Sequence, residues 1–139
     1  DFPDDTFDMV CGTSILHHLD IARAAREVRR VLKPGGRAIF YEPVGHNPIV
    51  NLYRKLTPSL HTVDEHPLVR SDFKLLRTHF DRVRMELYDL FSIGAIPLLR
   101  LPGGRFALRA HELVDRPMLK IPGLRWWGSV VVIDMTAGS

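Results

Sequence analysis

The sequence predicts an α/β fold, and three observations lead to this class. Apolar runs at residues 7–11 and 38–41 are typical of strands that a parallel sheet buries on both faces. Between them, residues 21–32 repeat apolar side chains at helical spacing, with arginines on the opposite side. A strand, a crossover helix and a second strand form the unit of parallel sheets, so we expect the two strands to be parallel neighbours.

The residues around the first helix mark its boundaries. Gly12 is expected to end the first strand, and Asp20 is a good N-cap for the helix that follows. Pro34-Gly35-Gly36 is expected to stop this helix, and Lys33 near its carboxyl end suits the negative pole of the helix dipole.

The middle of the chain is less regular. Residues 42–70 are typical of a long loop, with four prolines and a short amphipathic piece at residues 49–54. Ser71 and Asp72 are expected to cap a helix over residues 73–80.

Two further strands are expected near the carboxyl terminus. Residues 83–88 alternate in character, which favours a strand near a sheet edge, whereas residues 126–135 are strongly apolar and belong inside the sheet. Residues 92–125 are rich in proline and glycine and should hold one helix at about 106–115. The apolar side chains that share a face of this helix are Phe106, Ala110, Leu113 and Val114.

Size and composition favour one globular domain over residues 1–139, because 45% of the 139 residues are hydrophobic and 25% are charged. The net charge of +3 is small, so the arginines of the first helix indicate a solvated face and no nucleic-acid partner. The single cysteine, Cys11, excludes an internal disulfide and favours a reducing, cytoplasmic setting. No apolar run approaches the ~20 residues of a membrane span, so we expect no stable membrane insertion.

Three segments carry a family resemblance: residues 7–10, residues 16–19 with their two histidines, and residues 28–36 with the Lys33-Pro34-Gly35-Gly36 turn. Together they resemble the second half of class I S-adenosylmethionine-dependent methyltransferases, and most of all the ubiquinone/menaquinone C-methyltransferase-like group (methyltransferase type 11/12). Residues 41–48 and 64–68 resemble one bacterial branch of that group.

The resemblance implies a Rossmann-like fold of three layers, α/β/α, in which this chain supplies strands four to seven of a seven-stranded sheet. The last strand would be antiparallel and inserted beside the second strand of this chain. The family's glycine-rich cofactor loop and the acidic residues that hold the ribose and adenine would all precede Asp1. We therefore expect residues 1–139 to be the C-terminal half of a longer enzyme and to bind S-adenosylmethionine poorly on their own.

The expected ligand site lies beyond the carboxyl ends of the first two strands, where open parallel sheets bind their ligands. By resemblance, Cys11, Gly12 and Thr13 are candidate contacts of the methionine part of S-adenosyl-L-methionine, mainly through backbone groups. Gly12 has an equally good structural explanation, since a tight turn after a strand needs a small residue. Cys11 is not expected to act as a nucleophile, because the sequence shows no basic partner.

His18 and Glu42 are the candidate catalytic residues. Adjacent histidines point in different directions, and His18 is the better candidate for orienting or deprotonating an acceptor. The alternative is that one histidine caps or packs the helix start while the other is solvated. Adjacent histidines also lack the spacing of a metal pair, so no metal site is predicted. Glu42 would accept a hydrogen bond from substrate or, as the favoured alternative, cap the loop that follows it.

The long loop carries further polar residues, including His46, Asn47 and the run at residues 64–66. A polar lid is favoured over a metal or acid–base cluster, because three consecutive residues rarely converge on one point. The apolar residues 91–101 and the pair Trp126-Trp127 would line a site for a lipid-like or aromatic acceptor or, as the favoured alternative, belong to the core.

The leading hypothesis is therefore a methyltransferase, represented by its C-terminal half, that methylates a small or lipid-like molecule at an O, N or C atom. A second hypothesis is a non-catalytic α/β module that completes the sheet of a partner chain. A nicotinamide dehydrogenase half-domain is the weakest, because the chain has neither a glycine-rich fingerprint nor a Tyr-x-x-x-Lys pair.

Overall fold

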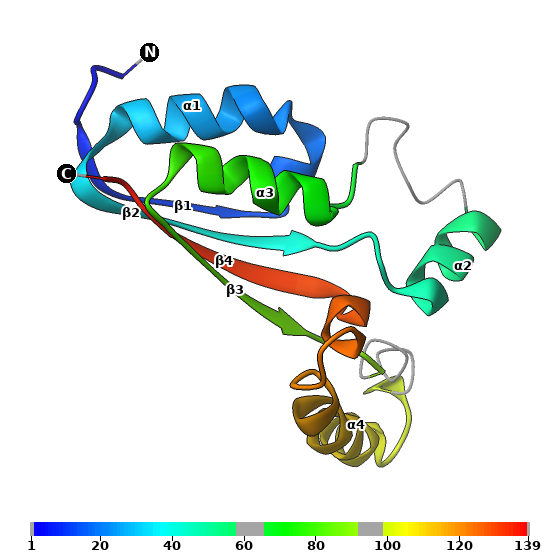
Figure 1. Ribbon diagram of the computed structural model, residues 1–139. Helices are drawn as coiled ribbons and strands as arrows, with labels where there is room; N and C mark the ends of the chain where they lie inside the picture. Colours follow the sequence, from blue (N-terminus) through cyan, green and yellow to red (C-terminus); the bar gives the residue numbers. More distant parts are fainter. Residues whose placement is uncertain (1, 58–65, 92–98, 139) are drawn as a thin grey trace.

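The computed structural model describes residues 2–57, 66–91 and 99–138, which are built around a four-stranded sheet (Figure 1). The spatial order of the strands is β1-β2-β4-β3. β1 and β2 are parallel, and β4 runs antiparallel to both of its neighbours, so the carboxyl ends of β1, β2 and β3 share one edge of the sheet. The strands are β1 (Phe7–Thr13), β2 (Leu32–Pro43), β3 (Arg82–Tyr88) and β4 (Val130–Thr136).

The predicted unit of strand, helix and parallel strand is confirmed. α1 (Ile21–Val31) connects β1 to β2, and the Asp20 side chain caps it by accepting a hydrogen bond from the Arg23 N–H at 2.8 Å. The helix ends before Lys33, because Leu32 already pairs with Phe7 as the first residue of β2. The chain then turns through Gly35, whose φ of +74° suits a residue without a side chain.

The two strands near the carboxyl terminus lie as predicted, with β4 inside the sheet and β3 at its edge. β4 starts at Val130, because the residues just before it, Leu124–Trp127, form a 3-10 turn, η4. Its inward side chains, Val131 and Ile133 among them, are fully buried. The antiparallel insertion of β4 beside β2 is the order that the family resemblance implied.

The helices that cover the sheet all lie on one of its faces. α1 and α3 (Arg70–His79) lie side by side there, and the core forms beneath them from side chains such as Phe73 and Phe40 (Figure 1). The α/β class and the Rossmann-like sheet are thus confirmed, and the described residues supply one of the two helical layers. β1 was expected to be buried on both faces, which is wrong for the described residues: Met9, on the other face, is 49% exposed, because no described helix crosses that face.

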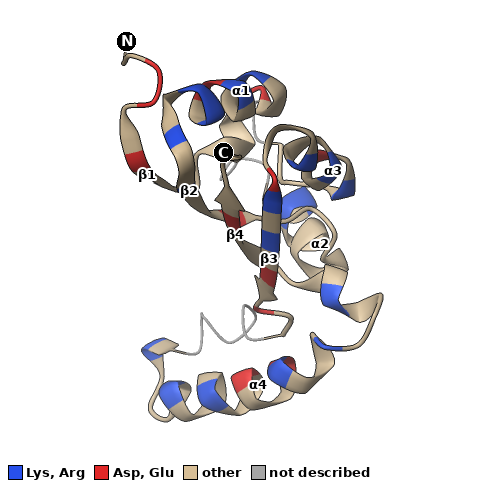
Figure 2. Ribbon diagram, turned by 60° about the vertical axis from the view of Figure 1, so that its left-hand side comes forward, with Lys and Arg blue, Asp and Glu red and all other residues tan. Residues whose placement is uncertain are grey.

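Two more helices lie beyond the carboxyl ends of the strands (Figure 1 and Figure 2). α2 (Pro48–Leu56) contains the predicted amphipathic piece, and α4 (Gly104–Met118) extends the predicted helix at both ends. α3 starts at Arg70, earlier than expected, because the Asp72 carboxylate lies within its first turn and accepts the Val69 N–H at 2.8 Å. Among the described helices, none has the length and apolar character needed to cross a bilayer.

Candidate active site

The loops after β1 and β2 lie side by side at the carboxyl edge of the sheet, as predicted. The Ser14 N–H donates to the Tyr41 carbonyl at 2.8 Å, which extends the strand pairing one residue beyond β1. Ser14 itself adopts a positive φ of 51°, and the chain then enters a 3-10 turn, η1 (Leu16–His18), before α1 begins. This sharp bend places the η1 backbone directly over the end of β2.

Glu42 fastens η1 to β2. Its side chain is fully buried, and Oε1 accepts the backbone N–H groups of Ile15 and Leu16, each at 2.9 Å. Oε2 lies 2.9 Å from Nδ1 of His17 and 3.4 Å from its backbone nitrogen. A carboxylate that replaces its water shell with this many donors is well suited to a buried position. Glu42 therefore holds the turn that follows β1, and not the loop that follows Glu42 itself.

The two adjacent histidines have different surroundings. His17 is 7% exposed and bonded to Glu42, and its carbonyl accepts the His66 N–H at 2.8 Å. His18 is exposed, with its ring centroid 4.0 Å from that of His17. His18 is thus the member of the pair that a ligand can reach, and His17 is the packed member, as the structural alternative for the pair expected.

The three candidate cofactor contacts divide between the two faces of the sheet. β1 continues to Thr13 and does not end before Gly12. Cys11 and Thr13 are exposed and pair with Ile39 and Tyr41 on the side without helices, whereas Gly12 lies on the helical side.

Gly12 is small for a packing reason. A Cβ atom there would lie 2.5 Å from Cε1 of Phe40 and 2.9 Å from Cγ2 of Ile15, far inside contact distance. Its φ is not positive, so the structural explanation is close approach of a core ring and not the tight turn that was expected.

Asn47 is a buried structural residue that links several loops at the carboxyl edge of the sheet. It is 1% exposed, and Oδ1 caps α2 by accepting the N–H groups of Ile49 and Val50 at 2.9 and 3.1 Å. Its Nδ2 lies 3.2 Å from the Leu90 carbonyl oxygen and 2.6 Å from that of Trp127. Asn47 therefore joins the loop after β2 to the loop after β3 and to the turn that precedes β4. In the predicted lid, residues 64 and 65 lie outside the described residues.

His46 lies next to Asn47 in a less polar setting. Its ring and that of Trp126 pack in a T-shaped arrangement with centroids 5.6 Å apart, and the Arg70 guanidinium lies 4.7 Å from the Trp126 ring centroid. Its Nδ1 is buried and has no hydrogen-bond partner within the described part of the chain. Burial, and then the positive charge of Arg70, lower the pKa of His46 below its ordinary value, which favours the neutral ring.

The apolar segments that could have lined an acceptor site have mixed surroundings. Trp126 packs on Phe73 of the core with ring centroids 5.7 Å apart, which supports the core alternative, while Trp127 is 46% exposed. Of residues 91–101, positions 92–98 lie outside the described residues, and Leu101 is exposed.

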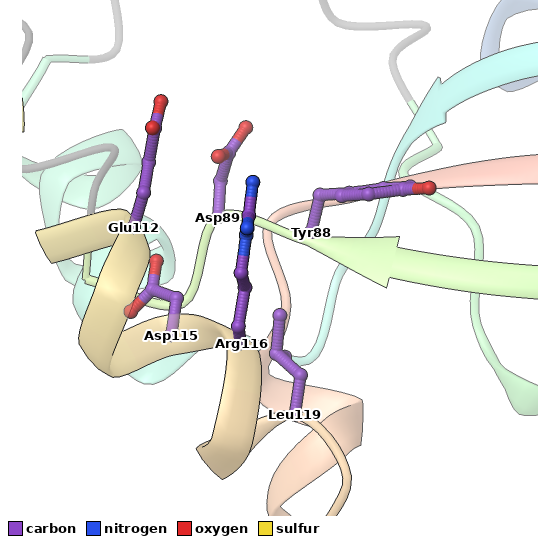
Figure 3. A pocket seen from close by; sticks show the side chains of 6 residues that line it. All are labelled: Tyr88, Asp89, Glu112, Asp115, Arg116 and Leu119. Atoms are coloured by element: carbon purple, nitrogen blue, oxygen red, sulfur yellow. The ribbon is translucent and has the colours of Figure 1, made fainter. Parts of the chain in front are cut away.

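A cavity of about 230 Å³ lies between the carboxyl end of β3 and α4 (Figure 3). In the sheet, β4 separates β3 from β2, so the cavity is two strands away from the end of β2. The buried Asp115 carboxylate, which lines the cavity, accepts the N–H groups of Leu90 and Phe91 at 2.9 Å. No group of three potential metal ligands occurs within the described ranges. The residues that line the cavity are Tyr88, Asp89, Glu112, Asp115, Arg116 and Leu119.

The segment that contains β1, η1 and most of β2 is similar to known methyltransferases. Residues 1–40 match a family model described as a methyltransferase domain. The protein YafE of Escherichia coli K12, itself uncharacterized, is 39% identical over 62 residues, which are 42% of this chain and 30% of that protein. The chain spans less than a third of the length of the two curated relatives it matches.

Solved structures show the same fold over nearly the whole chain. A phosphoethanolamine N-methyltransferase of Haemonchus contortus, in complex with phosphomonomethylethanolamine and S-adenosylhomocysteine, has a TM-score of 0.63 at 12% identity and covers 100% of this chain and 35% of that one. A methyltransferase of Archaeoglobus fulgidus, described as dependent on S-adenosylmethionine, has a TM-score of 0.59 at 13% identity and covers 96% and 61%. The four-stranded sheet and its helices therefore have the Rossmann-like methyltransferase fold.

Proposed function

We propose that this chain is the C-terminal part of an S-adenosylmethionine-dependent methyltransferase of the ubiquinone/menaquinone C-methyltransferase-like group, acting in the cytoplasm on a small or lipid-like acceptor. The observation that carries the proposal is the edge formed by β1, η1 and β2. The methyltransferase match covers β1 and most of β2. Immediately beyond it, Glu42 holds η1 in one conformation through its contacts with Ile15, Leu16 and His17.

The residues at this edge fit one end of the cofactor. Cys11 and Thr13 are small and exposed on the face without helices, so a ligand can approach the backbone of β1 there. We propose that Cys11, Gly12 and Thr13 contact the methionine part of S-adenosylmethionine. The described residues include no glycine-rich loop for the ribose and adenine, and we propose that residues preceding Asp1 in a longer protein supply it.

Bound S-adenosylmethionine would supply a methyl group on a sulfonium, so that the acceptor bonds to the methyl carbon while the carbon–sulfur bond breaks and the acceptor loses a proton. Alignment contributes most to such a displacement, because the sulfonium is an excellent leaving group. We assign the proton to the exposed His18 imidazole and a positioning role to Glu42, which acts through His17.

Amide chemical shifts measured during titration with S-adenosylhomocysteine test this assignment. We expect the amides of residues 11–14 and 42 to shift, with weak affinity, and adenosine alone to shift them less. The matched control is the amide of Arg82, at the opposite end of the sheet, which should not move. Shifts confined to other parts of the chain would contradict the placement. Binding as tight as that of a complete enzyme would contradict the incomplete cofactor site.

The second hypothesis, a non-catalytic module that completes a partner chain, also has a specific observation in its favour. Met9 and Tyr41 are 49% and 40% exposed on the uncovered sheet face, and the outer edge of β1 pairs with no described strand. Light scattering distinguishes the two hypotheses when combined with the titration. The module would be favoured by a stable complex of the chain in which Cys11 no longer reacts with a maleimide. It would also require that the amide chemical shifts stay unchanged when S-adenosylhomocysteine is added.

A further inference from the structure

The outer surface of α4 is unusual for a helix of a globular domain. Gly104 and Asp115, on one side, are buried against the rest of the protein. Phe106 and Leu113, on the opposite side, are 78% and 69% exposed. The apolar face that the sequence predicts for this helix therefore points into solvent, and the helix contacts the body through a narrow, partly polar side.

A row of cations borders this apolar face. Arg105, Arg109 and Arg116 are all exposed, and with 3.6 residues per turn they lie within roughly 40° of one another around the helix axis. Glu112 lies on the same flank, so three positive charges and one negative charge leave a net charge of +2. Figure 2 shows the basic segments along α4.

α2 repeats the same pattern on a smaller scale. Ile49, Leu52 and Leu56 are spaced at i, i+3 and i+7, and all are more than half exposed. None of the residues of α2 is buried. Lys55 is exposed beside this stripe and adds a positive charge.

A single residue holds both helices at the same end of the sheet. The Leu90 carbonyl oxygen lies 3.2 Å from Nδ2 of Asn47, the N-cap of α2. The Leu90 N–H donates to Asp115 of α4 at 2.9 Å, and Leu90 itself is 1% exposed. The two exposed apolar stripes are thus fixed to one buried point beyond the carboxyl ends of the strands (Figure 1).

We infer that α2 and α4 form a docking surface for an anionic lipid bilayer. We define this helical surface by the residues Ile49, Leu52, Leu56, Phe106, Leu113, Arg105 and Arg109. Helices that lie in a membrane interface combine an apolar face with flanking cations, and both features are present here. A second copy of the chain fits less well, because a two-fold contact centred on α4 would bring the same arginines together. The inference does not depend on the proposed methyl transfer.

Co-sedimentation with lipid vesicles tests this inference on the 139-residue chain. Vesicles of phosphatidylcholine with about one third phosphatidylserine should bind the chain, and vesicles of phosphatidylcholine alone should bind it at least about tenfold more weakly. High salt should weaken the binding to the phosphatidylserine vesicles, because it screens the arginines. Equal binding to both kinds of vesicle would overturn the inference.

Two double variants separate the contributions of the charges and of the apolar residues. Arg105→Gln with Arg109→Gln should weaken binding to phosphatidylserine vesicles by about 30-fold, since each interfacial cation contributes about 1 kcal/mol. Phe106→Ser with Leu113→Ser should weaken it at least about tenfold through loss of apolar burial. All four side chains are exposed, so circular dichroism melting should show that the fold is retained.

The matched control removes exposed apolar side chains from a different surface. Met9→Ser with Tyr41→Ser alters the uncovered sheet face and should change vesicle binding by less than about twofold. If this control loses as much binding as the α4 variants, non-specific adhesion explains the result and the inference fails. Sedimentation velocity tests the other candidate partner of this surface, a second copy of the chain. Dimers that Phe106→Ser with Leu113→Ser abolishes, together with no vesicle binding, would assign the helical surface to a second copy and overturn the inference.

Discussion

Oε2 of Glu42, on β2, lies 2.9 Å from Nδ1 of His17, which is 25 residues earlier in the chain. Both side chains are buried. Because the same carboxylate accepts the N–H groups of Ile15 and Leu16, the end of β2 and the turn after β1 form one rigid unit. The exposed His18 ring is then carried on a fixed backbone. The geometry of this edge therefore depends on Glu42 more than on any of the residues that face solvent.

Glu42→Gln should destabilise the chain by roughly 2–4 kcal/mol, because the new amide group would direct its own N–H groups at buried N–H donors. Urea unfolding monitored by tryptophan fluorescence measures the free energy of unfolding. Glu112→Gln, an exposed position on α4, is the matched control and should change this value by less than about 0.5 kcal/mol. A Glu42→Gln variant as stable as the control would show that the turn does not depend on this carboxylate.

Gly12→Ala should cost roughly 1–3 kcal/mol, because its Cβ would overlap the Phe40 ring. In a double-mutant cycle, Phe40→Leu should recover at least about 1 kcal/mol of this loss by making room. Gly35→Ala is the control. It meets no atom within 4 Å but has a φ of +74°, so it should cost about 1–2 kcal/mol with no recovery from Phe40→Leu. Purely additive effects at Gly12 and Phe40 would rule out the contact as the cause.

Asn47→Ala should destabilise the chain by roughly 2–4 kcal/mol, since it removes the cap of α2 and the bonds to Leu90 and Trp127 together. Asn51→Ala removes one bond, to the Gly45 carbonyl, and should cost about 1 kcal/mol. Amide hydrogen exchange at Ile49 should accelerate in the first variant only. Similar exchange in both variants would contradict the capping role.

His46 should titrate below its ordinary pKa of 6.5 when followed by proton NMR of the ring. Because its pKa is lower in the folded chain than in the unfolded chain, the unfolded chain binds more protons as the pH falls through 6.5. The contribution of His46 to stability is therefore complete above this pH and is lost as the pH falls toward the folded pKa.

Two charged neighbours, Arg70 and Asp72, shift the pKa of His46 in opposite directions, so substituting each one tests the cause of the shift. Arg70→Gln should raise the pKa of His46 toward its ordinary value, and Asp72→Asn should lower it further, because the two charges act in opposite directions. An unchanged pKa in both variants would show that burial alone lowers it, and the two charges would then have no part in the shift.

Local patterns in the sequence predicted most of the sheet. The helical spacing after Asp20 located α1, and the contrast between the alternating residues of β3 and the apolar residues of β4 located the sheet edge and its interior. These predictions succeed because each pattern reflects the immediate surroundings of its own segment. The open face of β1 was missed, because a run of apolar residues shows that a strand can be buried but not which neighbours are present.

The site was harder to predict, because it depends on contacts between distant segments. No local signal links Glu42 to the N–H groups of Ile15 and Leu16, and so its role as an anchor of η1 was not foreseen. The sequence indicated that one histidine of the pair would be packed and the other solvated, but only the contact with Glu42 identifies the packed one as His17. On α4, spacing identified the apolar face correctly but could not show that Phe106 points outward.

The position of β4 between β2 and β3 has a consequence for biosynthesis. β3 leaves the ribosome before β4, yet β4 is the strand it pairs with. Until residues 130–136 have emerged, β2 lacks one neighbour and β3 lacks its only one among the described strands. The sheet can therefore close only once β4 is available, and until then the nascent chain exposes unpaired edges of β2 and β3 that chaperones can shield.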